Sequence, residues 1–528
     1  MFAKLGQIRP GHLSRYFCTA LRNGNNRYDV VVVGGGMVGF GLAALAASSN
    51  ILQGKRILLL ENMPKKSYQM RDTFEARVVA LSCSSQLMLQ KLNAWEFVQS
   101  KRAQPVKAMK VWEDKSDAFL VFERDPLAYI VENDLVIESL RLVADKAPNP
   151  VTVEYNALVD EIELPSSDQP DQLARVHIRS LQSDRPRVVE TNLVVGADGV
   201  KSKVREIADL QTIGWDHGQA AVVATLCKSE ASFEAEILCA NVLPFNIKKR
   251  RSEPFTAWQR FVGNGPIALL PLSADCSSLT WSTTNEEADR LLSMSETDFV
   301  QSLNYALTKP NAPTPPEAQV LGRLGQLLAG LADQFCGHTV TPSLGPTNPP
   351  TAPQICHLQS GSKRMKFPLG FLHANNYHAS RAVLVGDAAH RILPLAGQGV
   401  NLGFGDVTSL VQCLEEAVSQ GADLGSATFL QEYTFDRQRA VLPIAATMEL
   451  LNLLYSTDAF ALKLSEILQL GQSSTSRTPA SYAHQLYARV LTTIRSAGLN
   501  TVQYSALVKD FLMNAAITGQ IGVSPSEL

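Results

Sequence analysis

The first hundred residues alternate short apolar runs with polar or glycine-rich breaks, and this pattern predicts β–α–β units. Residues 30–33 are four consecutive valines, as in a buried parallel strand. A glycine-rich break follows at residues 34–39, and an Ala/Leu-rich stretch then continues to about Ser49, which predicts a helix. A second apolar strand is predicted over residues 56–60, directly before Glu61. The expected order is strand, tight turn, helix and strand.

The same region could be mistaken for a membrane span. Residues 30–47 form an uncharged stretch of 18 residues, mostly apolar, which is long enough to attract attention as a transmembrane helix. Glycines stand at positions 34, 35, 36, 39 and 41. Because glycine is a poor helix former, this composition suits a strand–turn–helix far better than one continuous helix.

Two later segments repeat the change from apolar strand to polar loop. Residues 193–195 lead into the motif GADGVKSKVR at 196–205, and residues 381–385 lead into GDAAHRILPLAGQGVN at 386–401. Both apolar runs are typical of buried parallel strands. Since parallel strands present their carboxyl ends at one sheet edge, we expect both motifs to lie beside the glycine turn at 34–39.

The middle of the chain reads as β-rich and the end as helical. Strands are predicted over residues 221–226, 267–270 and 278–282. Helices dominate after Asp406, and apolar positions of one late segment recur at helical spacing: Tyr504, Leu507, Val508, Phe511, Leu512 and Ala515. That helix either packs on the body of the protein or docks on a membrane surface or a partner.

Composition narrows the function classes. The chain has 528 residues, with 45% hydrophobic and 19% charged residues, which is a globular composition large enough for two or three domains. The formal net charge of -2 gives no sign of nucleic-acid binding. The eight cysteines are scattered without a C-x-x-C pair, so we expect free thiols in a reducing compartment and no metal site.

The N-terminus is basic in a way that the total charge conceals. Residues 1–27 contain Lys4, Arg9, Arg15, Arg22 and Arg27 but no acidic residue. An arginine-rich, acid-free and mildly amphipathic start is typical of a mitochondrial transit peptide. A basic N-terminus without a targeting role is the alternative.

The glycine turn has the spacing of a dinucleotide-binding loop. Gly34 would permit the tight turn, Gly36 would let the backbone approach a pyrophosphate, and Gly39 would let helix pack on strand. Glu61 lies 22 residues beyond Gly39, about where an acid binds ribose hydroxyls. An acid there disfavours a 2′-phosphate, which suits FAD or NAD better than NADP.

The third motif points to a flavin. Asp387, at a strand's carboxyl end, is placed to hold a ribityl hydroxyl. The Gly397-Gln398-Gly399 loop can bring backbone N–H groups against a flavin ring. A helix starting near Asn401 would add its positive dipole end to the same region.

Together the three motifs resemble the FAD-dependent aromatic monooxygenases of the para-hydroxybenzoate-hydroxylase type. The chain looks closer still to the ubiquinone-biosynthesis hydroxylases, and within them to the mitochondrial ring hydroxylase, through further segments at 128–133, 257–261, 265–272 and 367–370. The resemblance covers roughly residues 28–310 and 365–455.

The resemblance implies roles for individual residues. It implies that Gly34, Gly36 and Gly39 bind the FAD pyrophosphate, that Glu61 binds the adenosine ribose, and that Asp198 reaches the pyrophosphate region. Arg77 would lie near the flavin phosphates and ribityl chain, unless it is a surface arginine at a helix start. The residues expected around the ribityl chain and isoalloxazine are Gly386, Asp387, Gly397, Gln398, Gly399 and Asn401. His390 and Pro394 are candidates near the active-site face, with a structural hydrogen-bonding role for His390 equally open.

The implied fold is α/β: a Rossmann-like FAD-binding domain with an inserted mixed β-sheet substrate domain and C-terminal helices. The expected division is a transit peptide at 1–27, an FAD-binding domain from 28–105, 132–205 and 370–415, a substrate domain from 106–131 and 206–369, and a helical region at 416–528. Polar excursions are expected in a Pro-rich loop at about 311–366 and at 471–483. A basic run at 248–251 reads as a solvated loop or a site for an acidic partner.

The resemblance also implies a reaction and partners. FAD would be reduced, form a C4a-hydroperoxide with O₂ and hydroxylate the aromatic ring of a polyprenyl-hydroxybenzoate-type precursor in ubiquinone biosynthesis. The electron donor is expected to be ferredoxin with its reductase. The chain shows one GxGxxG motif and hence no separate nicotinamide domain. NAD(P)H stays open, because related soluble hydroxylases bind it transiently without such a domain. The expected setting is a multi-enzyme complex, peripherally attached to the matrix side of the mitochondrial inner membrane. The alternatives are a flavin hydroxylase of a soluble phenol and a non-catalytic prenyl-binding escort protein on the same fold.

Overall fold

The computed structural model describes most of the chain. The described residues are 26–165, 172–180, 183–228, 253–263, 265–312, 320–321, 349–394 and 397–455, with 493, 495–496, 498–499 and 502–503. Several predictions lie mostly or wholly outside them: the transit peptide, the basic run, most of the Pro-rich loop, the insertion at 471–483 and the amphipathic helix at 504–515.

The first sheet is built around the glycine turn. Its main path runs β16 (His378–Ala379), β17 (Ala382–Leu384), β9 (Ser183–Gly196), β1 (Arg27–Val33), β2 (Ile57–Leu60) and β6 (Thr152–Glu154). β7 (Ala157–Glu163) and β8 (Ala174–Ser180) extend it from β9. The pairs β1–β2, β1–β9 and β17–β9 are parallel, so the predicted gathering of three motif-bearing strands in one sheet is confirmed.

Helices cover this sheet, and α2 (Met37–Ser48) is central among them. The stretch of residues 30–47 is thus β1 followed by α2, as the glycine pattern predicted. Most of α2 is buried, because it packs against both α5 (Asn133–Lys146) and α11 (Gln398–Ser419). Within the described ranges, no helix combines the length and apolar character needed to cross a membrane.

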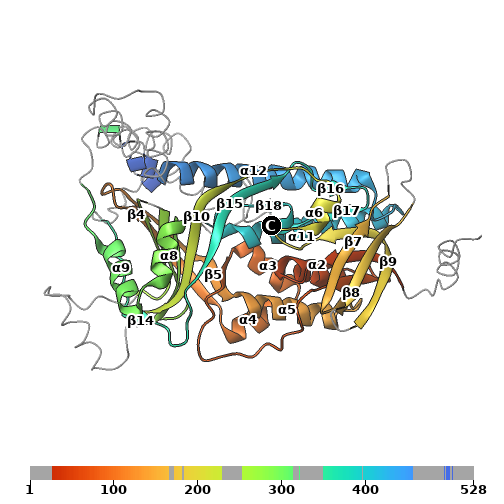
Figure 1. Cartoon of the computed structure of the whole chain (residues 1–528), viewed down its shortest axis with the longest axis horizontal. Helices are drawn as coiled ribbons and strands as arrows, with labels where there is room; N and C mark the ends of the chain where they lie inside the picture. Colours follow the sequence, from red (N-terminus) through yellow and green to blue (C-terminus); the bar gives the residue numbers. More distant parts are fainter. Residues whose placement is uncertain are drawn as a thin grey trace, which may run out of the picture.

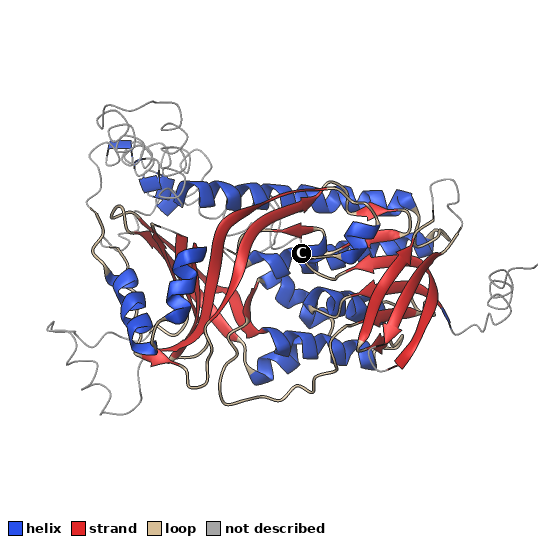
Figure 2. Cartoon of the chain, in the orientation of Figure 1, coloured by secondary structure: helices blue, strands red, loops and turns tan. Residues whose placement is uncertain are grey.

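The second sheet is larger and mixed, and its long strands cross the other half of the molecule (Figures 1 and 2). Its path runs β18 (His390–Arg391), β15 (Met365–Ala374), β10 (Thr212–Cys227), β13 (Cys276–Thr284), β12 (Gly265–Pro271), β11 (Thr256–Val262), β4 (Gln104–Glu113), β5 (Phe119–Glu132) and β3 (Val78–Leu81). β14 (His357–Leu358) pairs with β10. The three strands predicted in this part are present as β10, β12 and β13.

The remaining helices are distributed over both sheets. α8 (Asn285–Ser293) and α9 (Glu296–Thr308) cover one face of the second sheet. α3 (Cys83–Lys91), α4 (Trp95–Lys101) and α6 (Lys203–Ile207) lie with the first sheet, and α12 (Ala427–Tyr455) runs along both (Figure 1). The helical end predicted after Asp406 is therefore confirmed for residues 406–455.

The two sheets do not divide at the predicted domain boundaries. β3 lies inside a segment expected in the FAD-binding domain, yet it pairs with β5 in the second sheet. β15 continues through residue 370, where the boundary was expected. β18 also lies in a segment expected in the FAD-binding domain but belongs to the second sheet. The division into domains therefore stays a prediction, and β3, β15 and β18 are among the strands where sheet membership and that division differ.

Candidate functional site

Four strands of the first sheet end at the same edge, and each is followed by residues singled out from the sequence. β1 ends before Gly34, β2 before Glu61, β9 before Asp198 and β17 before Gly386. Because these strands run parallel, their carboxyl ends form one line of polar loops. Segments some 350 positions apart in the chain therefore meet at one site.

The glycine turn is shaped by close backbone contacts. Gly34 has a φ of 108°, and a Cβ there would lie 2.4 Å from the Ala197 carbonyl oxygen. A Cβ on Gly39 would lie 1.9 Å from the Gly34 carbonyl oxygen, so helix and strand could not pack as they do. A Cβ on Gly36 would meet no protein atom within 4 Å, which leaves the amino end of α2 open. That end has no side-chain cap, so its N–H groups are available to an anion.

Glu61 is fixed beside this turn by backbone donors. The Gly35 N–H donates to Glu61 Oε2 and the Met63 N–H donates to Oε1, each at 2.7 Å. A Cβ on Gly35 would come within 2.7 Å of Oε2, so a larger residue there would displace the Glu61 side chain. Sequence reasoning did not single out Gly35, because it is not one of the three glycines of the motif.

The second motif places one unpaired oxygen in the site. Asp198 Oδ2 accepts hydrogen bonds from the Lys203 and Val204 N–H groups at the start of α6. Its Oδ1 is buried and has no hydrogen-bond partner among the described residues. Arg205 donates to the Ala388 carbonyl oxygen and so ties this motif to the third one. An orphaned carboxylate oxygen is costly unless a ligand satisfies it.

The third motif begins in a tight turn against α2. Gly386 has a φ of 60°, and a Cβ there would lie 3.1 Å from Val38 Cγ2. The Asp387 side chain is exposed, whereas Gly386 and Ala388 on either side are buried. Burial by the surrounding protein nevertheless raises the pKa of Asp387. The Asp387 carboxyl group is therefore accessible to a ligand although protein atoms surround it.

The Gly-Gln-Gly loop is the first turn of a helix. α11 begins at Gln398, with Gly397 as its N-cap at a φ of 63° and without a side-chain cap. A Cβ on Gly399 would meet nothing within 4 Å. The helix was predicted to begin near Asn401, but it begins three residues earlier, at Gln398. Gly397 is its N-cap and Gly399 lies in its first turn, whereas the prediction placed both glycines in a preceding loop. Half-buried Pro394 accepts a long 3.5 Å hydrogen bond from the Gly397 N–H.

The Asn401 side chain forms structural hydrogen bonds that its position in the motif did not reveal. Its Oδ1 accepts from the Ser82 N–H at 2.9 Å and the Ser85 hydroxyl at 2.7 Å. Its Nδ2 donates to the Ala80 carbonyl oxygen at 2.9 Å. The side chain is 6% exposed and therefore anchors α11 to β3 and α3. No sequence signal identifies these partners, which lie more than 300 residues away.

Arg77 is exposed and immediately precedes β3, so the alternative of a helix start is wrong. Its carbonyl oxygen accepts from the Asn133 N–H at 3.1 Å. Asn133 Oδ1 is buried without a hydrogen-bond partner among the described residues. Asn133 closes a segment that carried part of the family resemblance, but nothing in its residue type singled it out as a site residue.

His390 points into a buried polar network instead of an open site. Its Nε2 lies 2.7 Å from Asp406 Oδ2, which also accepts from the Gly386 N–H at 2.8 Å. Asp406 Oδ1 accepts from Arg437 Nε at 2.9 Å. Burial would raise the pKa of Asp406, but the contacts with His390 and Arg437 outweigh it and lower the pKa to about 2. The structural role considered for His390 accounts for these contacts.

A second histidine lies beside this network. The Tyr377 hydroxyl is 2.9 Å from His373 Nε2, and the Tyr377 ring lies 5.8 Å from that of His390. Burial, with the nearby His390, lowers the pKa of His373 to about 4. Burial also raises the pKa of Tyr377. Ionisable side chains therefore pack behind the turn at Gly386. Of these, only His390 was considered from the sequence.

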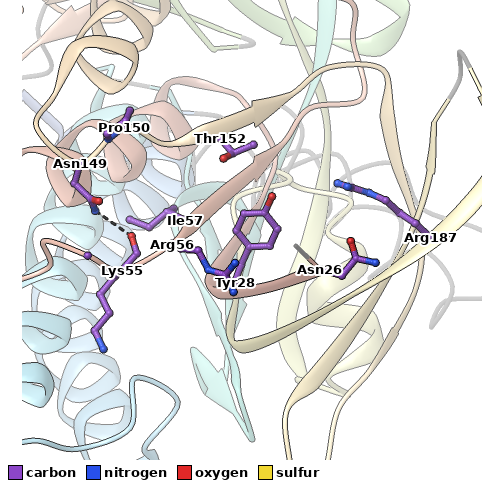
Figure 3. A pocket seen from close by; sticks show the side chains of 10 residues that line it. Asn26, Tyr28, Lys55, Arg56, Ile57, Asn149, Pro150, Thr152 and Arg187 are labelled. Atoms are coloured by element: carbon purple, nitrogen blue, oxygen red, sulfur yellow. Dashed lines mark hydrogen bonds between the residues drawn. The ribbon is translucent and has the colours of Figure 1, made fainter. Parts of the chain in front are cut away.

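A cavity of about 550 Å³ lies at the opposite edge of the first sheet (Figure 3). It is lined by residues near the amino ends of β1, β2 and β6, including Tyr28, Ile57 and Thr152. The Arg56 guanidinium lies 5.7 Å from the centre of the Tyr28 ring. None of the predicted site residues lines this cavity. The glycine turns, the orphaned carboxylate oxygen and the helix ends all lie at the other edge, which we take as the functional one.

The residues at that edge fit FAD. An uncapped helix end suits a pyrophosphate, and the openings over Gly36 and Gly399 admit a ligand close to the backbone. The orphaned oxygen of Asp198 is a further place for a ligand donor. Over the described ranges, no cluster of three or more His, Cys, Asp or Glu side chains is arranged to hold a metal ion.

Comparison with known proteins agrees with this geometry. A family model described as an FAD binding domain matches residues 27–320 and 353–446. The mitochondrial ubiquinone biosynthesis monooxygenase of Xenopus tropicalis is 38% identical over 457 residues, covering 86% of this chain and 91% of that protein. The Caenorhabditis elegans protein of the same name is 36% identical over 499 residues, covering 93% of this chain and 96% of that protein.

Solved structures share the architecture at low identity. The crystal structure of p-nitrophenol 4-monooxygenase from Pseudomonas putida has a TM-score of 0.56 at 17% identity and covers 92% of this chain and 98% of its own. The flavin-dependent monooxygenase PieE, in complex with FAD and substrate, has a TM-score of 0.54 at 14% identity and covers 95% and 74%. At these identities the likeness concerns the fold alone.

Proposed function

The chain belongs to the family of mitochondrial ubiquinone biosynthesis monooxygenases, and from this premise we propose that it hydroxylates a polyprenyl-hydroxybenzoate-type precursor. It is an FAD-dependent monooxygenase that acts on an aromatic ring with O₂ as co-substrate. FAD supplies the activation of O₂ when it is bound and reduced. The chain's own residues bind the cofactor, position the ring and exclude water.

The proposal assigns the sheet edge to FAD, residue by residue. The amino end of α2, opened by Gly36, binds the pyrophosphate, and Gly34 and Gly39 shape that turn. Glu61, already held by two backbone N–H groups, accepts from the adenosine ribose. Asp198 and Arg77 lie toward the pyrophosphate and ribityl chain, and Asp387 accepts from a ribityl hydroxyl. The first turn of α11, from Gly397 to Gly399, presents backbone N–H groups to the isoalloxazine.

The substrate part of the proposal rests on one observation. One face of the second sheet is turned toward the loop of the third motif. Along β10, the side chains of Ala220, Val222 and Ala224 pack under α8 and α9. Ala221, on the opposite face, packs instead with Leu393, next to Pro394 in the third motif. Because strand side chains alternate, Val223 and Thr225 share the face of Ala221. We call this face the flavin-side wall.

The flavin-side wall combines apolar and hydroxyl side chains and is partly open. In β15, Phe367 pairs with Ala221 and Met365 with Val223, so both side chains belong to the wall. Each of them is 40% exposed. Thr225 Oγ1 is buried on the same face without a hydrogen-bond partner among the described residues. On β13, the partners of Ala221, Val223 and Thr225 are Ser282, Thr280 and Ser278, so hydroxyl groups share this face. A partly open surface that combines apolar side chains with hydroxyl groups suits an aromatic ring that carries a hydroxyl and a prenyl chain.

Partners and location extend the proposal. We propose that electrons reach the flavin from ferredoxin and its reductase, with NAD(P)H as the competing donor. The relatives are named mitochondrial, and we propose attachment to the matrix side of the inner membrane within a ubiquinone-biosynthesis complex. A polyprenylated substrate must leave a bilayer to reach the flavin, which favours peripheral contact with that membrane.

A reconstituted reaction tests the proposal. Purified chain should carry FAD, seen as a flavin absorbance band, and should convert the polyprenylated phenol to a catechol when ferredoxin, its reductase and O₂ are supplied. The matched control is Gly498→Ala, at an exposed helical glycine outside the predicted site with open space around it, which should keep FAD and activity. Colourless protein that takes up no FAD would support the escort alternative. Turnover of soluble phenols but not of prenylated ones would support the other alternative, a flavin hydroxylase of a soluble phenol.

A further inference from the structure

Two cysteines of the second sheet face each other across neighbouring strands. Cys227 is the last residue of β10 and Cys276 the first of β13, and the two are direct partners in the antiparallel register. Their Sγ atoms lie 3.6 Å apart. The structure describes five cysteines, and none of them forms a disulfide: positions 83, 227, 276, 356 and 413. This pair therefore has its sulfur atoms in contact without a bond.

The register makes the pair suitable for a disulfide. The Lys228 N–H donates to the Asp275 carbonyl oxygen at 2.8 Å, which makes those two residues a hydrogen-bonded pair. Since hydrogen-bonded and non-hydrogen-bonded pairs alternate, Cys227 and Cys276 occupy a non-hydrogen-bonded position, where Cα atoms are about 4.5 Å apart. Disulfides span Cα separations of about 4.4–6.8 Å. Side-chain rotation can therefore bring the sulfurs to bonding distance, about 2.05 Å, without moving the strands.

The pair lies on the flavin-side wall. Cys227 follows Ala221, Val223 and Thr225 in the alternation along β10. Cys276 packs against the apolar cluster formed by Val106, Ile130, Ala257 and Leu272, and both cysteines are only half-buried. A small solute on the substrate side of the sheet can reach them.

A third thiol is nearby but otherwise engaged. The Cys356 thiol donates to the Lys228 carbonyl oxygen at 3.1 Å, and the Cys356 N–H donates to the Cys227 carbonyl oxygen. These two bonds fix Cys356 against the backbone of the β10 end. It is the natural competitor for either cysteine, and its participation is an outcome that the experiment distinguishes.

We propose that Cys227 and Cys276 are a dithiol that hydrogen peroxide oxidises to a disulfide. One thiolate attacks the peroxide, so that an S–O bond forms, the O–O bond breaks and the expelled oxygen leaves as water. The second thiol then displaces the resulting sulfenic hydroxyl as water. Two thiols and one peroxide give one disulfide and two waters. The source of peroxide rests on the proposed function, because a flavin hydroxylase releases peroxide when it activates O₂ without hydroxylating a substrate.

The contact between the two sulfur atoms serves both steps. Burial, reinforced by the neighbouring Cys276, raises the pKa of the Cys227 thiol to about 12. Only the thiolate is the nucleophile. Because the sulfur atoms lie 3.6 Å apart, whichever cysteine attacks the peroxide has the other in place to resolve the sulfenic acid.

The experiment uses full-length, FAD-loaded, reduced protein treated with increasing hydrogen peroxide, followed by alkylation and peptide mass spectrometry. The expected result is a Cys227–Cys276 disulfide that forms before Cys356 or Cys413 is oxidised and that dithiothreitol reverses. Cys227→Ser and Cys276→Ser should each leave sulfenic acid on the remaining cysteine of the pair, detected with dimedone. Cys356→Ser is the matched control and should leave the disulfide unchanged. A disulfide that includes Cys356, or stepwise overoxidation of Cys276 in the unmodified chain, would overturn the proposal.

A second arm separates this proposal from the proposed function. Added peroxide needs no turnover, so disulfide formation in the first arm is independent of enzymatic activity. In the second arm the electron donor and O₂ are supplied without substrate, with and without catalase. Disulfide that forms only without catalase supports an enzymatic source of peroxide. If added peroxide forms the disulfide but turnover does not, the dithiol stands and the claim about its source of peroxide is wrong.

Discussion

Replacing Asp406 by asparagine should weaken both the fold and the flavin site. Asp406 is fully buried and accepts hydrogen bonds from the Gly386 N–H and Arg437 Nε, with His390 Nε2 at 2.7 Å. Asparagine has one acceptor oxygen in place of two. If that oxygen faces Gly386, the amide N–H₂ faces Arg437 Nε, and if it faces Arg437, the N–H₂ faces the Gly386 N–H. In either orientation, two hydrogen-bond donors face each other.

The magnitude follows from the charge left behind. Arg437 is only 2% exposed, so the substitution leaves a buried guanidinium without its counter-ion. Breaking a buried ion pair in this way costs about 3–5 kcal/mol. We therefore expect urea denaturation of the FAD-loaded protein to show a fall of that size in the free energy of unfolding. FAD should also dissociate more readily, because Asp406 holds the turn that carries Asp387.

Asp289→Asn is the matched control, since Asp289 forms a solvent-exposed ion pair with Lys366. Exposed pairs contribute about 0–1 kcal/mol, so this variant should unfold almost like the unmodified chain. The reasoning would be refuted if Asp406→Asn also lost less than about 1 kcal/mol, or if it kept its FAD as tightly as the control.

Four further substitutions test the site and the buried groups beside it. Gly39→Ala should destabilise the protein because its Cβ would lie 1.9 Å from a carbonyl oxygen, whereas Gly36→Ala should leave the melting temperature of FAD-free protein unchanged and weaken FAD binding. Equal melting temperatures for the two would contradict this. Glu61→Gln should weaken FAD binding by about 1.5–3 kcal/mol, as expected for a hydrogen bond to a charged group, and an unchanged Kd would count against the ribose contact. His373 has a pKa of about 4 instead of 6.5, so the unfolded chain binds a proton that the folded chain does not. The free energy of unfolding should therefore fall as the pH drops from 6.5 to 4, and His373→Asn should flatten that slope in pH-dependent denaturation.

The parts of the fold that sequence predicted are those with strong local signals. The valine run of β1, the glycines after it and Glu61 after β2 specify a strand–turn–helix–strand without reference to the rest of the chain. The parallel sheet then follows, because three such strands each end in a polar motif. The register of β10, β12 and β13 and the pairing of β3 with β5 needed the structure, since long-range strand pairing leaves no local trace.

The candidate site shows the same limit. Motif residues such as Gly36 and Asp387 could be found because the family spacing marks them. Asp406 and Arg437 could not, because an aspartate and an arginine within helical segments normally read as solvated residues. Only their burial, the ion pair between them and the contacts of Asp406 with Gly386 and His390 reveal that they support the flavin turn. Asn401 illustrates the converse, since its motif position suggested the flavin and its amide binds β3 and α3.

The most direct test of the central claim is the origin of the oxygen added to the substrate. Purified FAD-loaded protein would be supplied with a polyprenyl-hydroxybenzoate, the ferredoxin system and isotopically heavy O₂, and the product would be analysed by mass spectrometry. The account predicts one heavy oxygen atom on the aromatic ring. A product without heavy oxygen, or no ring hydroxylation by protein that holds FAD and is reduced by the donor, would contradict it.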